Sequence, residues 1–159
     1  MLFIDIETSS LASVTKYSLI QHASHESTRV TVIAYAFNDN PVEVVSTASW
    51  DTEAVAHFVD SLVQQTGKEF IVAHNAEYEA MLFKYCLGLD IKMSKYLCTM
   101  QLCSLNGYPL SLSNSTKFLL NTDDQKDQAG KALITRFGNL DPDKPNLSLI
   151  HISEPTRPY

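Results

Sequence analysis

Two carboxylates near the start of the chain have the spacing of a metal site. Asp5 and Glu7 stand two residues apart in the segment LFIDIE, which has the apolar composition of a β-strand. Side chains at positions i and i+2 of a strand point to the same face, so we expect these two to converge. Like charges this close are costly unless a cation lies between them, and oxygen ligands suit Mg²⁺ or Mn²⁺. The alternative is an edge strand whose acidic face is exposed to solvent, but Ile4 and Ile6 on the opposite face favour a central strand.

A second group of polar residues follows another predicted strand. The apolar run EFIVA leads directly into His74 and Asn75, and a helix is expected from about 76 to 87. Asparagine is a favourable first cap of a helix, and Glu79 lies one turn later on the same helical face as Asn75. Glu77 is offset from Glu79 by about 200° on the helical wheel, so we expect Glu77 to be solvated. The carboxylate of Glu79 is therefore placed to complete the metal site of the first strand, although an ordinary capped helix would carry the same residues.

The elements that must position these residues form a mixed α/β pattern. Asn38 to Pro41 spell a turn, so the strands on either side of it should pair as a hairpin. The order of elements is three strands, a helix, a strand, a helix, a strand and then helices, which predicts a five-stranded mixed sheet with flanking helices. The expected strands are 2–7, 30–37, 42–47, 69–73 and 96–100, and the expected helices are 52–66, 76–87, 112–120 and 129–137, with one further helical turn near 17–21.

Composition limits the classes of function. The 159 residues carry a formal net charge of −6 with a pI near 5.2, which argues against sequence-blind binding of nucleic acid through a basic surface. It does not exclude an enzyme that grips a phosphodiester through metal ions. No apolar run approaches the roughly 18 residues of a membrane span, and the first ten residues do not form a signal peptide, so we expect no membrane partner and a cytoplasmic location.

The cysteines and two histidines do not indicate a zinc or disulfide site. Cys86, Cys98 and Cys103 are an odd number without a CxxC pair, which fits a reducing compartment. His22 and His25 have HxxH spacing, but they lie in a Ser/Thr-rich segment with no paired cysteines, and a metal role is not favoured.

The motifs FIDIET and AHNAEYE together resemble the first two motifs of the DEDD-type 3′–5′ exonucleases, which share a ribonuclease-H-like fold. The resemblance is closer to the exonuclease region at the N-terminus of bacteriophage-type family A DNA polymerases. It is carried further by Lys16-Tyr17, by the strand AYAF, by Cys98-Thr99-Met100 and by the segment 126–134. It covers approximately residues 1 to 146, and the ordered set of motifs is more specific than the DxE pair alone.

The resemblance implies a ribonuclease-H-like domain and a role for each matching residue. Asp5, Glu7 and Glu79 would be the catalytic carboxylates and the ligands of two Mg²⁺ or Mn²⁺ ions, although most DEDD enzymes carry Asp where this chain has Glu79. The 3′-terminal nucleotide of single-stranded DNA would lie along Thr8, His74, Asn75 and Tyr78. The implied reaction is two-metal hydrolysis of the terminal phosphodiester.

One part of the family pattern is missing. No Tyr or His precedes an acid at the offset of the third motif, and Asp141 and Asp143 lie in a turn where we expect solvated loop acids. The string LSLIHISEPTR resembles the conceptual translation of a sequencing adapter. We therefore expect an exonuclease-like domain at 1–146 and a non-native tail at 147–159. The chain would then be a C-terminally truncated fragment with impaired activity, whose full-length form carries a polymerase domain in cis and works in the cytoplasm of a bacterial host if phage-encoded.

Two other functions remain open at this stage. One is a stand-alone DEDD exonuclease or oligoribonuclease, which would need the third motif. The other is a ribonuclease-H-like module that binds single strands without cutting them. The sequence does not separate DNA from RNA as the substrate, since it shows no recognisable reader of the 2′-hydroxyl.

Overall fold

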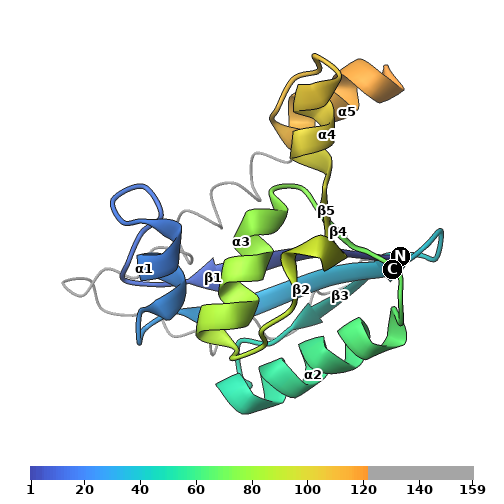
Figure 1. Cartoon of the computed structure of the whole chain (residues 1–159). Coiled ribbons are helices and arrows are strands. Elements are labelled where there is room, and N and C mark those ends of the chain that lie inside the picture. The colour runs from blue at the N-terminus through green and yellow to red at the C-terminus, as the bar shows by residue number, and fades with distance from the viewer. Residues whose placement is uncertain (122–159) are drawn as a thin grey trace, which may run out of the picture.

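The computed structural model of the chain describes residues 1–121 (Figure 1). Strands and helices alternate along these residues much as the sequence predicts. The elements in chain order are β1 (Leu2–Ser9), α1 (Leu19–Ser24), β2 (Arg29–Phe37), β3 (Glu43–Ser46), α2 (Thr52–Gln65), β4 (Ile71–Ala73), α3 (Ala76–Met81), the π-helix η1 (Leu82–Cys86), the 3-10 helix η2 (Met93–Lys95), β5 (Tyr96–Cys98), α4 (Thr99–Leu105) and α5 (Leu112–Leu120).

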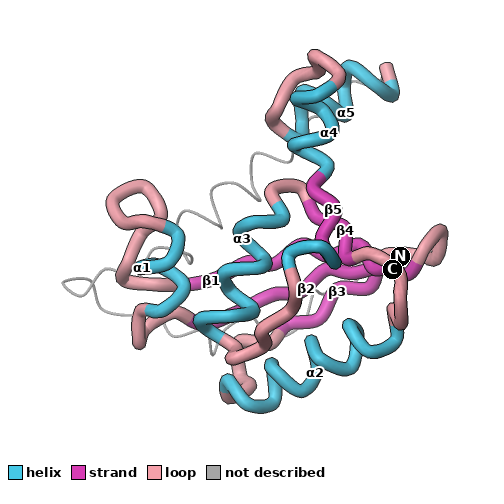
Figure 2. The backbone as a smooth tube through the Cα atoms, viewed as in Figure 1, coloured by secondary structure: helices cyan, strands magenta, loops and turns pink. Residues whose placement is uncertain are grey.

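The strands form one mixed sheet in the order β3-β2-β1-β4-β5 (Figure 2). β1 pairs with β2, and β2 with β3, in antiparallel fashion, whereas β1 with β4 and β4 with β5 are parallel. The hairpin between β2 and β3 turns at Asn38, whose φ of 50° is a left-handed conformation that Asn tolerates better than most residues. The five-stranded α/β sheet is confirmed, and β1 is its central strand.

One face of the sheet carries the hydrophobic core. Leu2, Ile4 and Ile6 alternate along β1 and are at most 4% exposed, and they belong to the same buried cluster as Val59 of α2 and Phe83 of η1. The intervening positions of β1 face the other way: Phe3 is 40% exposed and Asp5 is exposed. Phe3 and Asp5 of β1 are therefore accessible from the second face.

Side-chain caps explain where two helices begin. The Asp51 side chain accepts a hydrogen bond from the Ala54 N–H at 2.8 Å, and α2 starts at the next residue. Ser18 and Gln21 form a reciprocal capping box that starts α1, so the helical turn expected near 17–21 is present but lies two residues later. α1 therefore begins at Leu19 because its cap, rather than its apolar pattern, sets the start.

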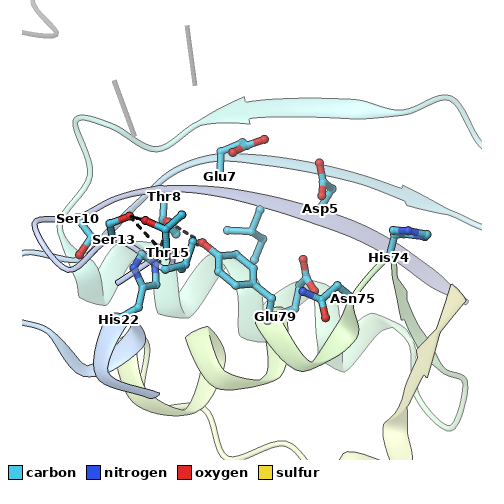
Figure 3. A pocket seen from close by; sticks show the side chains of 13 residues that line it. Asp5, Glu7, Thr8, Ser10, Ser13, Thr15, His22, His74, Asn75 and Glu79 are labelled. Atoms are coloured by element: carbon cyan, nitrogen blue, oxygen red, sulfur yellow. Dashed lines mark hydrogen bonds between the residues drawn. The ribbon is translucent and has the colours of Figure 1, made fainter. Parts of the chain in front are cut away.

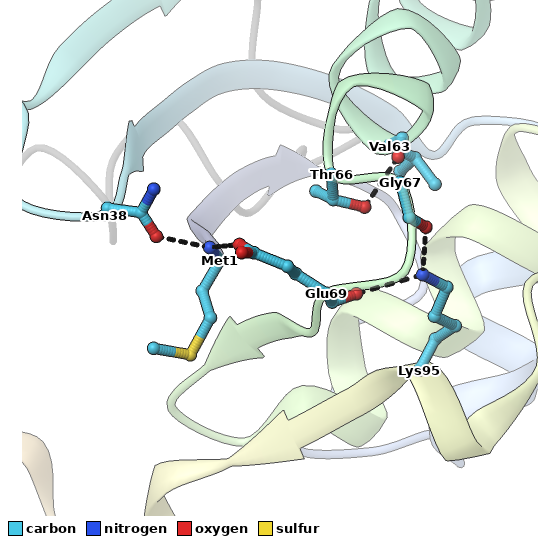
Figure 4. A network of polar contacts seen from close by, with 7 residues as sticks. All are labelled: Met1, Asn38, Val63, Thr66, Gly67, Glu69 and Lys95. Atoms are coloured by element: carbon cyan, nitrogen blue, oxygen red, sulfur yellow. Dashed lines mark hydrogen bonds and ion pairs between the residues drawn. The ribbon is translucent and has the colours of Figure 1, made fainter.

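A polar network ties the first residue to the end of the sheet opposite the carboxyl end of β1 (Figure 4). The N-terminal amine contacts both the Asn38 side chain and the Glu69 carboxylate. The Lys95 ammonium donates to the Gly67 and Glu69 carbonyls at 2.5 and 2.9 Å. These contacts link the start of β1 to the turn after β2 and to the residues just before β4, which η2 also contacts.

Two expected elements change type within their predicted range. The helix predicted over 76–87 changes at Leu82 into a π-helix, and the strand predicted over 96–100 ends at Cys98, where α4 begins. A short apolar run does not distinguish strand from helix by its pattern alone, which explains the second error. The expected helix at 129–137, the acids Asp141 and Asp143 and the tail at 147–159 lie outside the described residues. Among residues 1–121, none of the helices combines the length and hydropathy that crossing a bilayer requires.

Candidate active site

A cavity of about 380 Å³ opens at the carboxyl ends of β1 and β4 (Figure 3). β4 pairs with β1 only at Leu2 and Phe3, after which the chain leaves β4 and begins α3. Such ends of parallel strands are where open α/β sheets commonly hold their ligands. All seven residues predicted for the site line this cavity, together with His22. They are Asp5, Glu7, Thr8, His74, Asn75, Tyr78 and Glu79.

The two acids of β1 project to the same side of the strand, as their spacing predicts (Figure 3). Asp5 is exposed and Glu7 is half-buried. The pairing register between β1 and β2 shifts between Glu7 and Thr8, which is the mark of a β-bulge. The bulge interrupts the regular alternation of β1 at the point where it carries Glu7 and Thr8, both of which line the cavity.

Glu79 is the buried carboxylate of the group. Its side chain extends from α3 toward the part of β1 that carries Asp5 (Figure 3), and the residue is only 2% exposed. Its Oε2 atom is buried and has no hydrogen-bond partner among the described residues. Burial, reinforced by the negative charges of Asp5 and Glu7, raises the pKa of Glu79 to about 8. Glu77, two residues earlier, is exposed and lies outside the cavity lining, as the helical wheel predicts.

The donor set suits a hard divalent cation, although the ligands are not drawn together. Three carboxylates face one cavity, and one buried carboxylate oxygen is unpaired, a combination that a cation with oxygen ligands would satisfy. Within residues 1–121, no group of three His, Cys, Asp or Glu side chains is close enough to hold a metal ion.

Three polar side chains meet at the inner end of the cavity. The Thr8 hydroxyl lies 2.6 Å from the Tyr78 hydroxyl, and the His22 Nε2 atom lies 3.2 Å from Thr8 Oγ1 and 3.4 Å from Tyr78 OH. Burial is the main cause that raises the pKa of Tyr78, with the Glu7 and Glu79 charges adding to it. Thr8, Tyr78 and His22 are together called the hydroxyl triad below: two hydroxyls and the imidazole that contacts them. They join β1, α3 and α1.

His74 and Asn75 lie at the strand-to-helix junction but differ from the expectation in detail. Both ring nitrogens of His74 are engaged, Nδ1 with the Thr99 hydroxyl at 3.0 Å and Nε2 with the Leu110 carbonyl at 2.8 Å. Asn75 occupies the N-cap position of α3, yet its side chain makes no capping hydrogen bond, so the expected cap is wrong. The reason is its left-handed backbone (φ 84°, ψ 50°), since a capping side chain reaches the helix from an extended conformation.

His22 is a buried polar residue of the cavity that sequence reasoning did not assign to the site. Its HxxH spacing with His25 is typical of a zinc ligand, whereas in the structure His22 is 4% exposed and its Nε2 atom contacts the Thr8 hydroxyl. The Ser18–Gln21 capping box marks the start of α1 in the sequence, but the burial of His22 depends on how α1 packs near Thr8 and Tyr78.

Comparison with known proteins relates this chain to a polymerase by sequence and to nucleases by fold. No family model matches it. It is 34% identical over 137 residues to the DNA polymerase of Bacillus phage SP02; the match takes in 86% of this chain but spans only a fifth (20%) of that protein. A solved structure described as the apo form of the nuclease has a TM-score of 0.53 at 17% identity, covering 80% of this chain and 55% of the other. Brucella melitensis NrnC with bound Mg²⁺ has a TM-score of 0.52 at 16% identity, covering 86% and 72% respectively.

At such identities the solved structures establish the fold, and the polymerase match establishes the sequence relationship over most of the chain. The chain is therefore a sequence relative of one region of a phage DNA polymerase, and its mixed five-stranded sheet has a ribonuclease-H-like fold.

Proposed function

We propose that residues 1–146 form a 3′–5′ exonuclease domain that hydrolyses the terminal phosphodiester of single-stranded DNA. In a full-length protein this domain would proofread for a polymerase domain in cis. The observation that carries the proposal is the convergence of Asp5, Glu7 and Glu79 on one cavity, with the buried Glu79 Oε2 atom unpaired. Residues 147–159 are proposed to be foreign to the domain.

The carboxylates would hold the cofactor. Asp5, Glu7 and Glu79 would be ligands of two Mg²⁺ or Mn²⁺ ions, a proposal supported by the all-oxygen donor set and by the Mg²⁺ bound to the structural relative NrnC. When bound, such ions supply an acidified water and positive charge for the phosphate and the leaving oxygen. The exposed Asp5 side chain is free to turn toward the buried Glu79, whereas Glu79 is held by its burial.

The remaining cavity residues would position the terminal nucleotide. The Thr8 and Tyr78 hydroxyls and the Asn75 amide line the cavity beside the carboxylates and offer neutral hydrogen-bonding groups. His74 has both nitrogens occupied, so its contribution would be to hold the cavity wall rather than to bond the substrate. A net charge of −6 fits a protein that engages the end of a strand, because a long backbone track would require a basic surface.

Metal binding is the first test. Mn²⁺ titrated calorimetrically into the chain should give a binding isotherm that Asp5→Ala and Glu79→Gln remove. Glu77→Gln is the matched control, because it makes the same chemical change on the same helix at an exposed position outside the cavity lining. Equal heats for the wild type, Asp5→Ala and Glu79→Gln would refute the metal site.

Product analysis is the second test. A 5′-labelled single-stranded oligonucleotide incubated with Mg²⁺ or Mn²⁺ should shorten one nucleotide at a time from its 3′ end, and Glu79→Gln should stop this. Metal binding without any shortening would favour a module that binds nucleic acid but does not cut it.

A stand-alone exonuclease is the second candidate, and the shared fold of the solved nuclease NrnC supports it. Substrate length separates the two candidates. A proofreading domain should degrade the end of a long strand, while a stand-alone enzyme of this kind should prefer oligonucleotides of a few residues.

A further inference from the structure

The contact between His22 and the Ala12 carbonyl determines which atoms of the hydroxyl triad donate hydrogen bonds and which accept them. The His22 Nδ1 atom lies 2.5 Å from the Ala12 carbonyl oxygen. A carbonyl oxygen can only accept, so His22 Nδ1 carries a hydrogen, and this contact selects the Nδ1–H tautomer of the ring. The Nε2 atom is then an acceptor, and it faces Thr8 and Tyr78.

The two hydroxyls together have two hydrogens, and the triad uses both. One hydrogen lies in the 2.6 Å contact between Thr8 Oγ1 and Tyr78 OH, and the other goes to His22 Nε2. His22 is 4% exposed, so an Nε2 atom without a donor would carry a desolvation cost. Whichever hydroxyl donates to the ring, only oxygen lone pairs remain for the cavity.

We propose that His22 is a positioning residue that makes the Thr8–Tyr78 pair an acceptor, so that the pair recognises a sugar hydroxyl of the terminal nucleotide. The inference rests on the proposed function, because it requires a nucleotide in the cavity. A phosphate oxygen is an acceptor and gains nothing from this pair, whereas a hydroxyl is a donor that fits it. The recognised group is the 3′-hydroxyl of any strand or the 2′-hydroxyl of a terminal ribonucleotide.

Three oligonucleotides that differ only at the last sugar test this preference. They end in a 2′-deoxy-3′-hydroxyl, a 2′,3′-dideoxy or a 3′-deoxy-2′-hydroxyl nucleotide, and each carries a 5′ fluorophore and a cleavage-resistant phosphorothioate as its last linkage. Dissociation constants come from fluorescence anisotropy with the full chain and Mg²⁺. The wild type should bind the correct hydroxyl end about fivefold more tightly than the dideoxy end, the worth of one hydrogen bond. Tighter binding of the first oligonucleotide identifies the 3′-hydroxyl, and tighter binding of the third identifies the 2′-hydroxyl.

Two substitutions of His22 separate positioning from packing. His22→Asn keeps an amide donor at the place of Nδ1 for the Ala12 carbonyl but has no atom at the place of Nε2. His22→Gln keeps an acceptor at the place of Nε2 and loses the contact with Ala12. We expect the preference for the hydroxyl end to fall to about one in His22→Asn, because the hydroxyls can then rotate to donate, and to return in His22→Gln.

The ratio of dissociation constants distinguishes the possible results. A purely structural role would weaken the binding of all three oligonucleotides equally in both variants and leave the ratio unchanged, which would overturn the inference while leaving the proposed function intact. A wild-type chain that binds none of the three, or binds them equally well with and without Glu79→Gln, would overturn the proposed function and this inference with it.

Discussion

The Nε2–H group of His74 donates a hydrogen bond to the Leu110 carbonyl across 2.8 Å, and so links the end of β4 to the loop between α4 and α5. The Thr99 hydroxyl, at the start of α4, bonds the other nitrogen of the same ring at 3.0 Å. One side chain of the cavity wall therefore anchors both ends of the α4 region to the sheet.

Removing this anchor should loosen α5 without unfolding the domain. In His74→Ala, the amide hydrogens of 112–120 should exchange with solvent several-fold faster, since each lost hydrogen bond is worth about 1 kcal/mol. Amides of α2, which contacts neither partner, serve as the internal control. Unchanged exchange in α5 would show that the His74 ring does not hold this helix.

The raised pKa of Glu79 predicts that stability falls as pH rises. Between pH 4.5, its ordinary pKa, and about 8, the folded chain keeps the Glu79 proton and the unfolded chain has lost it. The unfolded state then binds fewer protons, so the free energy of unfolding decreases with pH, by at most about 1.4 kcal/mol per unit from this group. Below this range both states hold the proton, and above it both have released it, so the effect levels off.

Urea denaturation at a series of pH values, in chelator, measures this slope. The Glu79→Gln variant should lack the Glu79 contribution, while Glu77→Gln should keep the wild-type slope because Glu77 is exposed. Adding Mg²⁺ or Mn²⁺ at pH 8 should raise the free energy of unfolding of the wild type but not that of Glu79→Gln. Parallel pH profiles for the wild type and Glu79→Gln would contradict the prediction.

The Tyr96 hydroxyl is a second buried group without a hydrogen-bond partner among residues 1–121. Burial and the nearby charge of Glu79 raise the pKa of Tyr96, so the phenol stays neutral. Because an unpaired buried hydroxyl costs stability, Tyr96→Phe should raise the free energy of unfolding, by up to about 1 kcal/mol.

Tyr35→Phe is the matched control for that change. The Tyr35 hydroxyl donates to Glu43 at 2.7 Å in an exposed contact, so its loss should lower stability slightly, by less than about 0.5 kcal/mol. Chemical denaturation of the two variants should thus give opposite signs. Destabilisation by Tyr96→Phe would show that its hydroxyl has a partner in solution.

The parts of the site that follow from local periodicity were predictable from sequence. Asp5 and Glu7 share a face because a strand repeats every two residues, and Glu79 faces the site while Glu77 does not because a helix turns about 100° per residue. Both relationships depend on one element at a time. The hairpin and the central place of β1 follow from equally local signals, namely turn residues and an apolar opposite face.

The parts that depend on contacts between distant segments were not predictable. The bulge after Glu7 belongs to the pairing of β1 with β2, and the burial of His22 depends on α1 packing near Thr8 and Tyr78. The change from strand to helix at Thr99 likewise coincides with its bond to His74, a partner 25 residues away. Pattern reasoning has no access to such pairings, and these are the places where it went wrong or gave no assignment.

Asn75 offers a way to separate backbone strain from substrate contact. Its φ of 84° is tolerated by Asn and Gly, whereas an alanine there places its Cβ against the following carbonyl at a cost of about 1–2 kcal/mol. Asn75→Gly should therefore keep the wild-type free energy of unfolding, and in Asn75→Ala this free energy should fall by about 1–2 kcal/mol.

Both variants lack the side-chain amide, so if the amide contacts the terminal nucleotide, both should bind a single-stranded oligonucleotide several-fold more weakly. Asn38→Gly makes the same exchange at the left-handed hairpin turn, outside the cavity lining, and should leave binding unchanged. Wild-type affinity in Asn75→Gly would mean that the site requires the shape of this turn and not its side chain.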